Sequence, residues 1–558
     1  MTTAVHTLGL AHSTGFPLYV LSAKLFTFVF PFGEFAFRLN IYSALLTALS
    51  VALLYVLILE MELSTVAAFL ASSTFGLGFS IWRNAGQARI YPLALLFVIL
   101  LAFIFVRWQK DKHIRYLYWY VLVWGISFGT HLLVLTMIWP LLIMLWQKRD
   151  YLRTHVTVLG KAALLFFLPF VQYIYIPIAN ARHMTTSWGD TGGLMGFLYY
   201  ITQRQYVYKM IARDWTGIAL FFKQMGGVIF SELGAILFMI GIGGLIYFYK
   251  ENKPLCSALV LASLSNIVIM FSYGNEGDIG FLYRYLFIVH LTVAIGIAYS
   301  VTALGRVRNA KWFLVAFLIL LIFIELRTNY ARNNLRANFI VSDIAQNILE
   351  TVGPNSILFT TLDAPHGAIT YLQSERYRTD VIAVISDQLG FDWYVKDLIW
   401  KYPDTFSTGL LTIQGDYLRK NSLRIEEIVQ NNLDKRDMYA MFANNKLPDN
   451  RTLADDFTIT PIGVVNKITA KGDDSKMILA KNIDIWNNYQ LRGVFSDTYD
   501  KTMEYPLRIL YRDALYNLGV SYFKNGFTSQ AVDALQYSLK INYTPYAQNE
   551  LDFIEKQR

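Results

Sequence analysis

Long apolar runs dominate the first part of the chain, and only short ones follow. Before about residue 326, most runs reach the ~17–25 residues that an α-helix needs to cross a bilayer. They lie at about residues 37–59, 64–82, 90–107, 116–130, 131–147, 160–178, 228–249, 255–273, 281–303 and 311–326. The pattern predicts an α-helical polytopic membrane domain of about ten spans, followed by a water-soluble part.

The pattern after residue 327 changes to short elements. LRANFIVSDIAQNILETV reads as a polar helix that stops at Gly353-Pro354. NSILFTTLD and DVIAVIS read as two short buried strands with helical material between them, which is typical of a small α/β unit. Residues 405–500 are mixed and rich in Asn and Asp, and their pattern allows no assignment. We therefore predict a membrane domain at 1–326, an α/β domain at 327–505 and a helical segment at 506–558.

The segment ALYNLGVSYFKNGFTSQAVDALQYSLKI, residues 514–541, reads as a helical hairpin. Its small and apolar positions match the tetratricopeptide spacing. These positions are Leu518, Gly519, Tyr522, Gly526, Ala531 and Leu535. One such unit cannot bury its own apolar face, so the hairpin must pack on the rest of the domain or on a protein partner.

Composition and charge agree with a membrane protein. The chain is 55% hydrophobic and only 16% charged, whereas soluble proteins carry about 25% charged residues. The net charge of +9 does not indicate nucleic-acid binding, because much of the Lys and Arg lies in short loops between spans. Cys256 is the single cysteine, which excludes disulfides within the chain and metal sites built on cysteines.

Four short basic loops predict the topology. They contain Arg107, Lys110, Lys112 and Arg115; Lys148, Arg149, Arg153 and Lys161; Lys250 and Lys253; and Arg306, Arg308 and Lys311. If all four are cytoplasmic, residues 116–147 cross twice or re-enter. The loops at 1–36, 83–89, 179–227 and 274–280 then face outward, as does everything after Arg327. We expect a further span upstream of Met1, because residues 1–36 would otherwise lie outside with nothing to carry them across.

The stretch from Phe170 to Tyr206 concentrates the candidate chemistry. It begins as the end of a span, breaks at Pro177 and becomes a polar loop. Its polar and aromatic side chains are Arg182, His183, Trp188, Asp190, Arg204 and Gln205. A carboxylate, a ring and cations at the mouth of a span suit a lipid-linked substrate with a polar head. The alternative is a membrane-surface loop with an aromatic anchor.

Several ordered motifs resemble one family. LGLAHSTGFPLYVLSAKLF, followed by PFGEFAFRLNIYSALLTALSVALLY, is similar to the start of a bacterial polytopic membrane family related to the eukaryotic transmembrane O-mannosyltransferase, in the C-type glycosyltransferase superfamily. GISFGTHLLVL resembles its Gly-and-His span, and YIYIPI, WGD and GFLYYITQRQY resemble its most recognisable block. ILFTTLD with YLQSERYRTDVIAVISD resembles the segment after the last span. The resemblance extends to about residue 400.

This resemblance implies a membrane glycosyltransferase. Such an enzyme moves a sugar, for example mannose, from a polyprenyl-phosphate donor to a protein Ser or Thr or to a cell-surface glycan, at the outer face of the bilayer. Arg or Lys would bind the phosphate, and a carboxylate would act as base. No cofactor is implied with certainty, and a divalent metal stays open. The alternative is a non-catalytic membrane scaffold or transporter that retains the glycosyltransferase fold.

Two departures from the family pattern stand out. The family carries an acidic motif of the type Asp-Ser-Gly-Glu just before the position of Met1, and its Asp is the expected catalytic base. The sequence lacks this motif and the span before it. In WRNAGQARIY, residues 82–91, Arg89 stands where the family usually has Glu.

The resemblance and the topology together select the candidate site residues. The catalytic candidates are Asp190 and His12. The substrate-binding candidates are Trp188, Arg83, Arg89, Arg204, Gln205, Arg284 and His131. We expect the outward loops to bring His12, Arg83, Arg89, Asp190 and Arg284 together in one cavity that reaches the bilayer.

Each candidate also has a structural interpretation. Asp190 can cap the following helix, and Trp188 can anchor the chain at the membrane interface. Arg83 and Arg89 can extend to the interface as ordinary basic side chains do. Arg284 can pair with Glu276 or Asp278, and His131 can bond a neighbouring helix.

Overall fold

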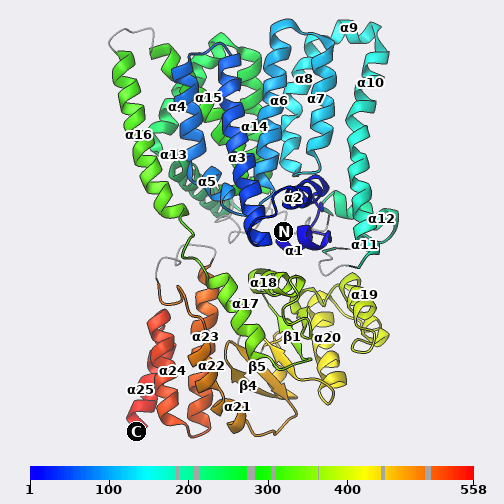
Figure 1. Ribbon diagram of the computed structural model, residues 1–558, viewed down its shortest axis with the longest axis vertical. Helices are drawn as coiled ribbons and strands as arrows, with labels where there is room; N and C mark the ends of the chain where they lie inside the picture. Colours follow the sequence, from blue (N-terminus) through cyan, green and yellow to red (C-terminus); the bar gives the residue numbers. More distant parts are fainter. Residues whose placement is uncertain are drawn as a thin grey trace. The chain divides into compact units, whose positions relative to one another are not determined.

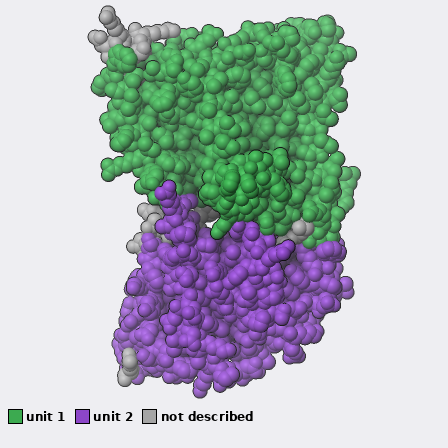
Figure 2. All heavy atoms as spheres, in the orientation of Figure 1, with its two compact units in different colours: residues 1–184, 188–334 green, residues 185–187, 335–558 purple. Residues whose placement is uncertain are grey.

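The structure is a computed structural model that describes residues 1–183, 188–189, 191–204, 214–272, 283–304, 310–361, 363–441, 446–496 and 504–557. The chain forms two compact units. Unit 1 comprises residues 1–184 and 188–334, and unit 2 comprises residues 185–187 and 335–558, coloured green and purple in Figure 2.

Unit 1 is helical (Figure 1). Within the described residues, six helices are long and apolar enough to cross a membrane, or seven if the bent pair α4 and α5 is one span. They are α3 (Phe35–Glu60), α6 (Tyr91–Asp111), the segment Val156–Ala181, α13 (Trp215–Glu251), α14 (Lys253–Ser272) and α15 (Phe287–Leu304). The chain is therefore a multi-pass membrane protein, as the apolar runs predict.

The other predicted runs also fall on helices. The remaining described elements of unit 1 are α1 (Thr2–Thr7), α2 (Pro17–Val29), α4 (Thr65–Leu77), α5 (Phe79–Ala85), α7 (Ile114–Ser127), η1 (Leu132–Met137), α8 (Ile138–Gln147), α9 (Arg149–Thr154), α12 (Gly193–Ile201) and α16 (Ala310–Asn333). Within Val156–Ala181, α10 (Val156–Phe167) is followed by η2 (Leu168–Ile174) and α11 (Tyr175–Ala181).

The run at 64–82 does not form the single straight span that its apolar pattern predicts. Helices α4 and α5 meet at Gly78 with a bend of 66°. Gly78 has an extended backbone, with φ −56° and ψ 144°, so the helical hydrogen-bond ladder stops there. The bend redirects the chain toward the loop that carries Arg89, which makes this break important for the candidate site.

Close backbone packing joins α13 and α15. A Cβ atom at Gly244 would overlap the carbonyl oxygen of Gly296, and one at Gly241 would overlap Val293. Ser300 Oγ donates to the carbonyl oxygen of Ile240 at 2.6 Å. Small residues that let two helix backbones approach are a common means of helix association in lipid, where apolar burial alone provides no driving force.

Unit 2 contains a five-stranded sheet in the order β2-β1-β3-β5-β4. Its strands are β1 (Ile357–Thr360), β2 (Ile382–Ile385), β3 (Met438–Ala440), β4 (Thr458–Ile462) and β5 (Val465–Thr469). Strands β2, β1 and β3 are parallel, and β5 pairs antiparallel with both β3 and β4. The predicted sheet-containing domain is confirmed, with β1 and β2 at the two segments that the sequence indicates.

Helices complete unit 2. They are α17 (Ile340–Thr351), α18 (Asp363–Ser374), η5 (Ser386–Gln388), α19 (Asp392–Lys401), η6 (Thr408–Leu411), α20 (Tyr417–Asn432), η8 (Leu453–Asp455), α21 (Lys476–Ala480), α22 (Asn482–Asn488), α23 (Tyr505–Lys524), α24 (Thr528–Ile541) and α25 (Pro545–Gln557). Residues 405–500, which the sequence pattern left unassigned, supply three of the five strands.

The predicted helical hairpin corresponds to α23 and α24. A Cβ atom at Gly519 would lie 2.7 Å from Leu535 Cγ, so these two helices pack closely. The apolar face of the hairpin shares a core with Leu479 of α21, and Tyr522 donates to the Leu479 carbonyl oxygen at 3.2 Å. The hairpin therefore packs on the rest of unit 2. Its tetratricopeptide character and a protein partner bound through it remain predictions.

His366 should make the stability of unit 2 depend on pH. Thr360 Oγ1 donates to the Val384 carbonyl oxygen at 3.1 Å and lies 2.8 Å from His366 Nδ1, so Nδ1 carries the proton of a neutral ring. Burial lowers the pKa of His366 from 6.5 to about 3. The unfolded chain therefore binds the proton first as the pH falls, and folding stability decreases below pH 6.5.

We expect a loss of about 1–2 kcal/mol between pH 6.5 and pH 5. Hydrogen exchange of the β1 amides in the detergent-solubilised full chain would measure it. The substitution His366→Asn should abolish this slope, since Asn does not titrate. Asp380, whose pKa the Arg378 guanidinium holds at about 2, does not titrate in this window. An unchanged slope in the Asn variant would show that another group is responsible.

Candidate functional site

Five aromatic side chains from distant segments of unit 1 form one cluster, which we call the aromatic cluster: His12, Phe16, Tyr91, His131 and Tyr285. The His12 ring meets the edge of Phe16 at 5.0 Å, and Phe16 stacks on His131 at 6.1 Å. The centroid of the His131 ring lies 5.5 Å from that of Tyr91 and 5.9 Å from that of Tyr285. Tyr91 and Tyr285 meet edge to face at 5.4 Å.

Helix ends place these rings. Phe16 precedes α2, whose first residue is Pro17, and Tyr91 is the first residue of α6. His131 lies between α7 and η1, where its Nδ1 accepts a hydrogen bond from the backbone N–H of Leu133 at 3.1 Å. The cluster thus forms where several helices begin or end, which leaves polar backbone groups close to the rings.

The stretch Phe170–Tyr206 holds the segment that contains His12. Tyr175 donates to the Gly9 carbonyl oxygen at 2.7 Å, and Gln203 Nε2 donates to the Ser13 carbonyl oxygen at 3.4 Å. Tyr200 makes two further bonds, accepting from Ser13 Oγ through its carbonyl oxygen and donating through its hydroxyl to the Ala11 carbonyl oxygen. The two sequence regions selected as functional therefore lie together.

Two arginines adjoin the aromatic cluster. Arg89 and Arg284 are both half-buried. The backbone N–H of Arg89 donates to Ser43 Oγ at 3.3 Å, and its guanidinium donates to Gln87 Oε1 at 2.9 and 2.6 Å. Burial, and after it the nearby charge of Arg284, lowers the pKa of the Arg89 guanidinium. The two guanidinium charges are near enough to interact, and an anion close to both would reduce their mutual repulsion.

Three tyrosine side chains oppose the lowering of the Arg89 pKa. Electrostatic interaction with Tyr283, Tyr91 and Tyr285 raises this pKa, so these side chains lie close to the guanidinium. Tyr283 also lies under the Arg284 guanidinium, 5.9 Å from its ring centroid. Arginine side chains flanked by phenol groups offer charge-assisted hydrogen bonds of the kind that bind a phosphate.

A buried carboxylate fixes the start of α5, and sequence reasoning missed it. Glu232 of α13 is 2% exposed. The backbone N–H of Ser80 donates to both oxygens of this carboxylate at 2.8 Å, and Ser80 Oγ donates to Oε1 at 2.7 Å. His290 Nδ1 lies 3.8 Å from the same oxygen. A Cβ atom at Gly78 would lie 2.7 Å from Glu232 Oε1, so a larger residue there would displace this carboxylate.

Helix α16 secures the other side of the same break. Asn329 Nδ2 donates to the Leu77 carbonyl oxygen at 2.9 Å, and Asn333 Nδ2 donates to that of Phe79 at 3.3 Å. The Arg332 guanidinium lies 3.9 Å from the Phe79 ring centroid. The backbone carbonyl oxygen of Arg332 accepts a hydrogen bond from Arg83 NH1 at 3.2 Å. The bend between α4 and α5 is therefore bonded on both sides, which orients α5 and the side chains it carries.

The signal for Glu232 and His290 was in the sequence. Glu232 is the only Asp, Glu, Lys, Arg or His in the run at 228–249, and His290 shares the run at 281–303 only with Arg284. Such residues inside apolar runs are rare and usually functional. Arg83, which the sequence did select, is 7% exposed and bonded within this network. Its position therefore supports the bend at least as directly as it supports a bound phosphate.

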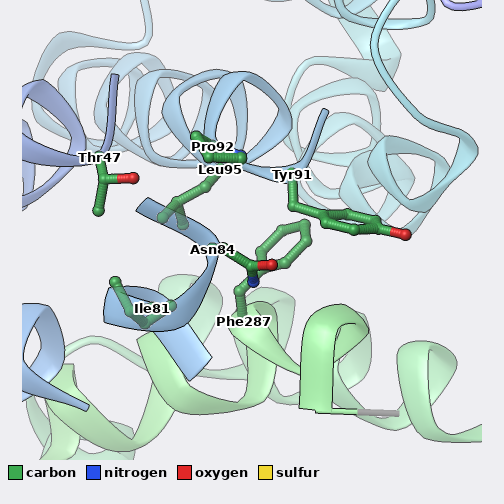
Figure 3. Close-up of a pocket in the computed structure, with 7 residues that line it drawn as sticks. All are labelled: Thr47, Ile81, Asn84, Tyr91, Pro92, Leu95 and Phe287. Atoms are coloured by element: carbon green, nitrogen blue, oxygen red, sulfur yellow. The ribbon is translucent and has the colours of Figure 1, made fainter. Parts of the chain in front are cut away.

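A small recess lies beside the aromatic cluster (Figure 3). Its lining residues are Thr47, Ile81, Asn84, Tyr91, Pro92, Leu95 and Phe287. Figure 3 shows the Asn84 side chain near the rings of Tyr91 and Phe287. Because Tyr91 belongs both to the recess and to the aromatic cluster, the two features adjoin.

Apart from Arg83, which belongs to the network at the bend, the predicted site residues fall into three groups. His12, His131, Arg89 and Arg284 lie in or beside the aromatic cluster. Trp188 is half-buried, and Arg204 is exposed after the end of α12. Asp190 and Gln205 lie outside the described residues, so convergence with Asp190 remains a prediction. In the described part of the chain, no group of three or more His, Cys, Asp or Glu side chains could hold a metal ion.

Comparison with known families identifies two domains. Residues 1–154 match the Protein O-mannosyl-transferase TMEM260 N-terminal domain, and residues 341–410 match the TMEM260-associated domain 2. The first match covers His12, Arg83, Arg89 and His131. The second covers β1, β2 and α19 in unit 2.

Two named relatives extend this similarity. The chain is 25% identical to the mouse Protein O-mannosyl-transferase TMEM260 over 438 residues, which is 73% of the chain and 61% of the relative. It is 21% identical over 443 residues to the Dictyostelium discoideum Protein O-mannosyl-transferase tmem260, covering 70% of the chain and 54% of the relative. The chain therefore spans less than two thirds of either relative.

Solved structures of ArnT from Cupriavidus metallidurans are also similar. The undecaprenyl phosphate complex aligns with 76% of this chain and 82% of its own, with a TM-score of 0.49 and 10% identity. The apo structure aligns with 76% of this chain and 81% of its own, with a TM-score of 0.40 and 11% identity.

Proposed function

We propose that this chain, which carries two domains of the TMEM260 protein O-mannosyl-transferase family, is a membrane glycosyltransferase that uses a polyprenyl-phosphate sugar. The acceptor is a protein Ser or Thr hydroxyl or a cell-surface glycan hydroxyl. The observation that carries the proposal is the placement of Arg89 and Arg284 beside the aromatic cluster. A cationic pair at the ends of membrane helices suits a phosphate whose lipid tail lies in the bilayer.

In the proposed reaction, the acceptor oxygen attacks the anomeric carbon of the sugar. The bond between that carbon and the phosphate oxygen breaks, and the phosphate leaves with the electron pair. Arg89 and Arg284 would stabilise the negative charge that develops on the phosphate, which is where preorganised cations lower a barrier most. The acceptor hydroxyl gives its proton to a base.

His12 is one candidate for this base, and Asp190 is the other. The His12 side chain is exposed, and its Nδ1 lies 3.2 Å from the Ser13 carbonyl oxygen. Because a carbonyl oxygen can only accept, Nδ1 carries the proton in this bond and Nε2 has the lone pair of the neutral ring. That tautomer is the one a general base needs at Nε2.

A transfer assay tests the proposed function. Purified full chain in nanodiscs would be incubated with polyprenyl-phosphate mannose labelled in the sugar, and with Ser- and Thr-containing peptides or surface glycans as acceptors. Appearance of label in an acceptor supports the proposal. Binding of the lipid without any transfer would favour a scaffold or transporter of the same fold.

The four basic loops predict that unit 2 is extracytoplasmic. Alkaline phosphatase, which is active only outside the cytoplasm, fused after Asn338 should therefore be active in bacteria. The same enzyme fused after Lys112 should be inactive, because that residue lies in a loop predicted to be cytoplasmic. A stably expressed but inactive fusion at Asn338 would contradict this topology and place the site on the other side of the membrane.

A further inference from the structure

The Asn84 side chain makes none of the hydrogen bonds described above for α5, yet it is almost fully buried. Its side chain is 5% exposed, and among the described residues its Oδ1 has no hydrogen-bond partner. An unsatisfied buried amide oxygen costs about 1–3 kcal/mol, so its presence calls for an explanation. Asn84 lines the recess, where a bound molecule could satisfy it.

The recess has a volume of about 10 Å³, which is room for one water-sized group such as a single sugar hydroxyl. Ile81, Leu95 and Phe287 give it apolar walls, so the sugar ring would stay outside while one hydroxyl enters. The amide oxygen of Asn84 can only accept a hydrogen bond. A sugar hydroxyl can donate to this oxygen, whereas a lipid phosphate without its sugar offers no sugar hydroxyl to donate.

The recess also has a polar side chain, Thr47, whose hydroxyl already donates a hydrogen bond within the protein. Thr47 Oγ1 donates to the Ser43 carbonyl oxygen at 2.9 Å, so its only proton is committed within α3. Ser43 Oγ in turn accepts from the backbone N–H of Arg89. Ser43 therefore links Thr47, in the wall of the recess, to the loop that carries Arg89.

We propose that Asn84 accepts a hydrogen bond from one hydroxyl of the donor sugar and so helps to select it. This inference rests on the proposed function, because it assumes that a phosphate lies at Arg89 and Arg284. Tyr91 lines the recess and contacts the aromatic cluster beside those cations. The proposal requires that a sugar attached to a phosphate at the cations extends past Tyr91 to the recess.

The test compares two lipids on the full chain in nanodiscs. A short-chain polyprenyl phosphate and its mannosyl ester would be titrated against wild type, Asn84→Ala and the control Ser50→Ala. Ser50 is a buried residue of α3 that does not line the recess, and its Oγ donates to the Leu46 carbonyl oxygen at 2.7 Å. Asn84→Ala should weaken binding of the mannosyl lipid about 2- to 10-fold and leave binding of the plain lipid unchanged.

If Asn84→Ala weakens binding of both lipids equally, or leaves binding of both unchanged, the assignment is wrong. If wild type binds neither lipid, the proposed function itself is wrong, and this outcome is distinct from failure of Asn84 alone. Monodeoxy mannosyl lipids add a measurement on the wild-type protein that does not depend on how the alanine variant folds. One of them should bind about 2- to 10-fold more weakly than the full sugar. If none does, no sugar hydroxyl bonds to the protein and the proposal fails.

Discussion

Glu232→Leu should destabilise unit 1 by about 3–5 kcal/mol and abolish transfer, because it leaves the start of α5 without its hydrogen-bond acceptors. The Ser80 backbone N–H and hydroxyl both donate to the carboxylate, and no other described side chain accepts from either at less than 3.5 Å. Since α5 leads to Arg89 and carries Arg83 and Asn84, its loss would disperse the cations of the candidate site.

Three variants separate the contributions at this position. Ser80→Ala removes only the hydroxyl bond and should cost about 1–2 kcal/mol. Glu232→Gln keeps the shape but places an amide NH₂ near one donor, so its cost should lie between those of the other two. The control Glu62→Gln changes a carboxylate that is 80% exposed and should cost less than about 0.5 kcal/mol.

Hydrogen exchange of the amides from Ser80 to Ala85 would measure the local effect, and unfolding in detergent mixtures the global one. If these amides exchange as slowly in the Glu232→Leu variant as in the wild type, the carboxylate does not hold α5, and another interaction must fix the bend.

Removing both Arg89 and Arg284 should weaken binding of polyprenyl phosphate by at least about 100-fold. A hydrogen bond to a charged group contributes about 1.5–3 kcal/mol, so two such groups account for a factor of this size. Each single substitution to alanine should weaken binding about 10-fold or more. Lysine at either position should restore part of the affinity, since it keeps the charge but not the two-pronged geometry of the guanidinium.

Equilibrium titration of the plain lipid at two salt concentrations would test this, because partly exposed charges bind more weakly at higher ionic strength. Arg115→Ala is the matched control: its side chain is 57% exposed and it lies in a loop predicted to be cytoplasmic. Wild-type affinity in the double variant would contradict the phosphate site and, with it, the observation that carries the proposed function.

Much of unit 1 could be predicted from the sequence because a bilayer allows few alternatives. A backbone in hydrocarbon must satisfy its own hydrogen bonds, so a long apolar run becomes a helix. Even so, the run at 64–82 breaks at Gly78, since the bond from Ser80 to Glu232 replaces the helical ladder. That partner is 152 residues away in the chain, and no local pattern indicates it.

In unit 2, too, some elements could be predicted from their own sequence and others depend on distant segments. Strands β1 and β2 are continuous apolar runs and could be read directly. Strand β3 has only three residues, and its place beside β1 and β5 depends on pairing with distant segments. Residues 405–500 therefore resisted assignment, because short strands are specified by their neighbours more than by their own composition.

The membrane helices, the sheet-containing second unit and most of the residue types in the candidate site follow from local sequence pattern, because hydrophobic length and spacing are local properties. Which residues meet depends on the fold. It joined His12, Tyr91, His131 and Tyr285 from separate helix ends, and it showed that Glu232 is a structural anchor. A buried carboxylate and an interfacial one look alike in a sequence, and they differ only in the hydrogen-bond donors that folding brings to them.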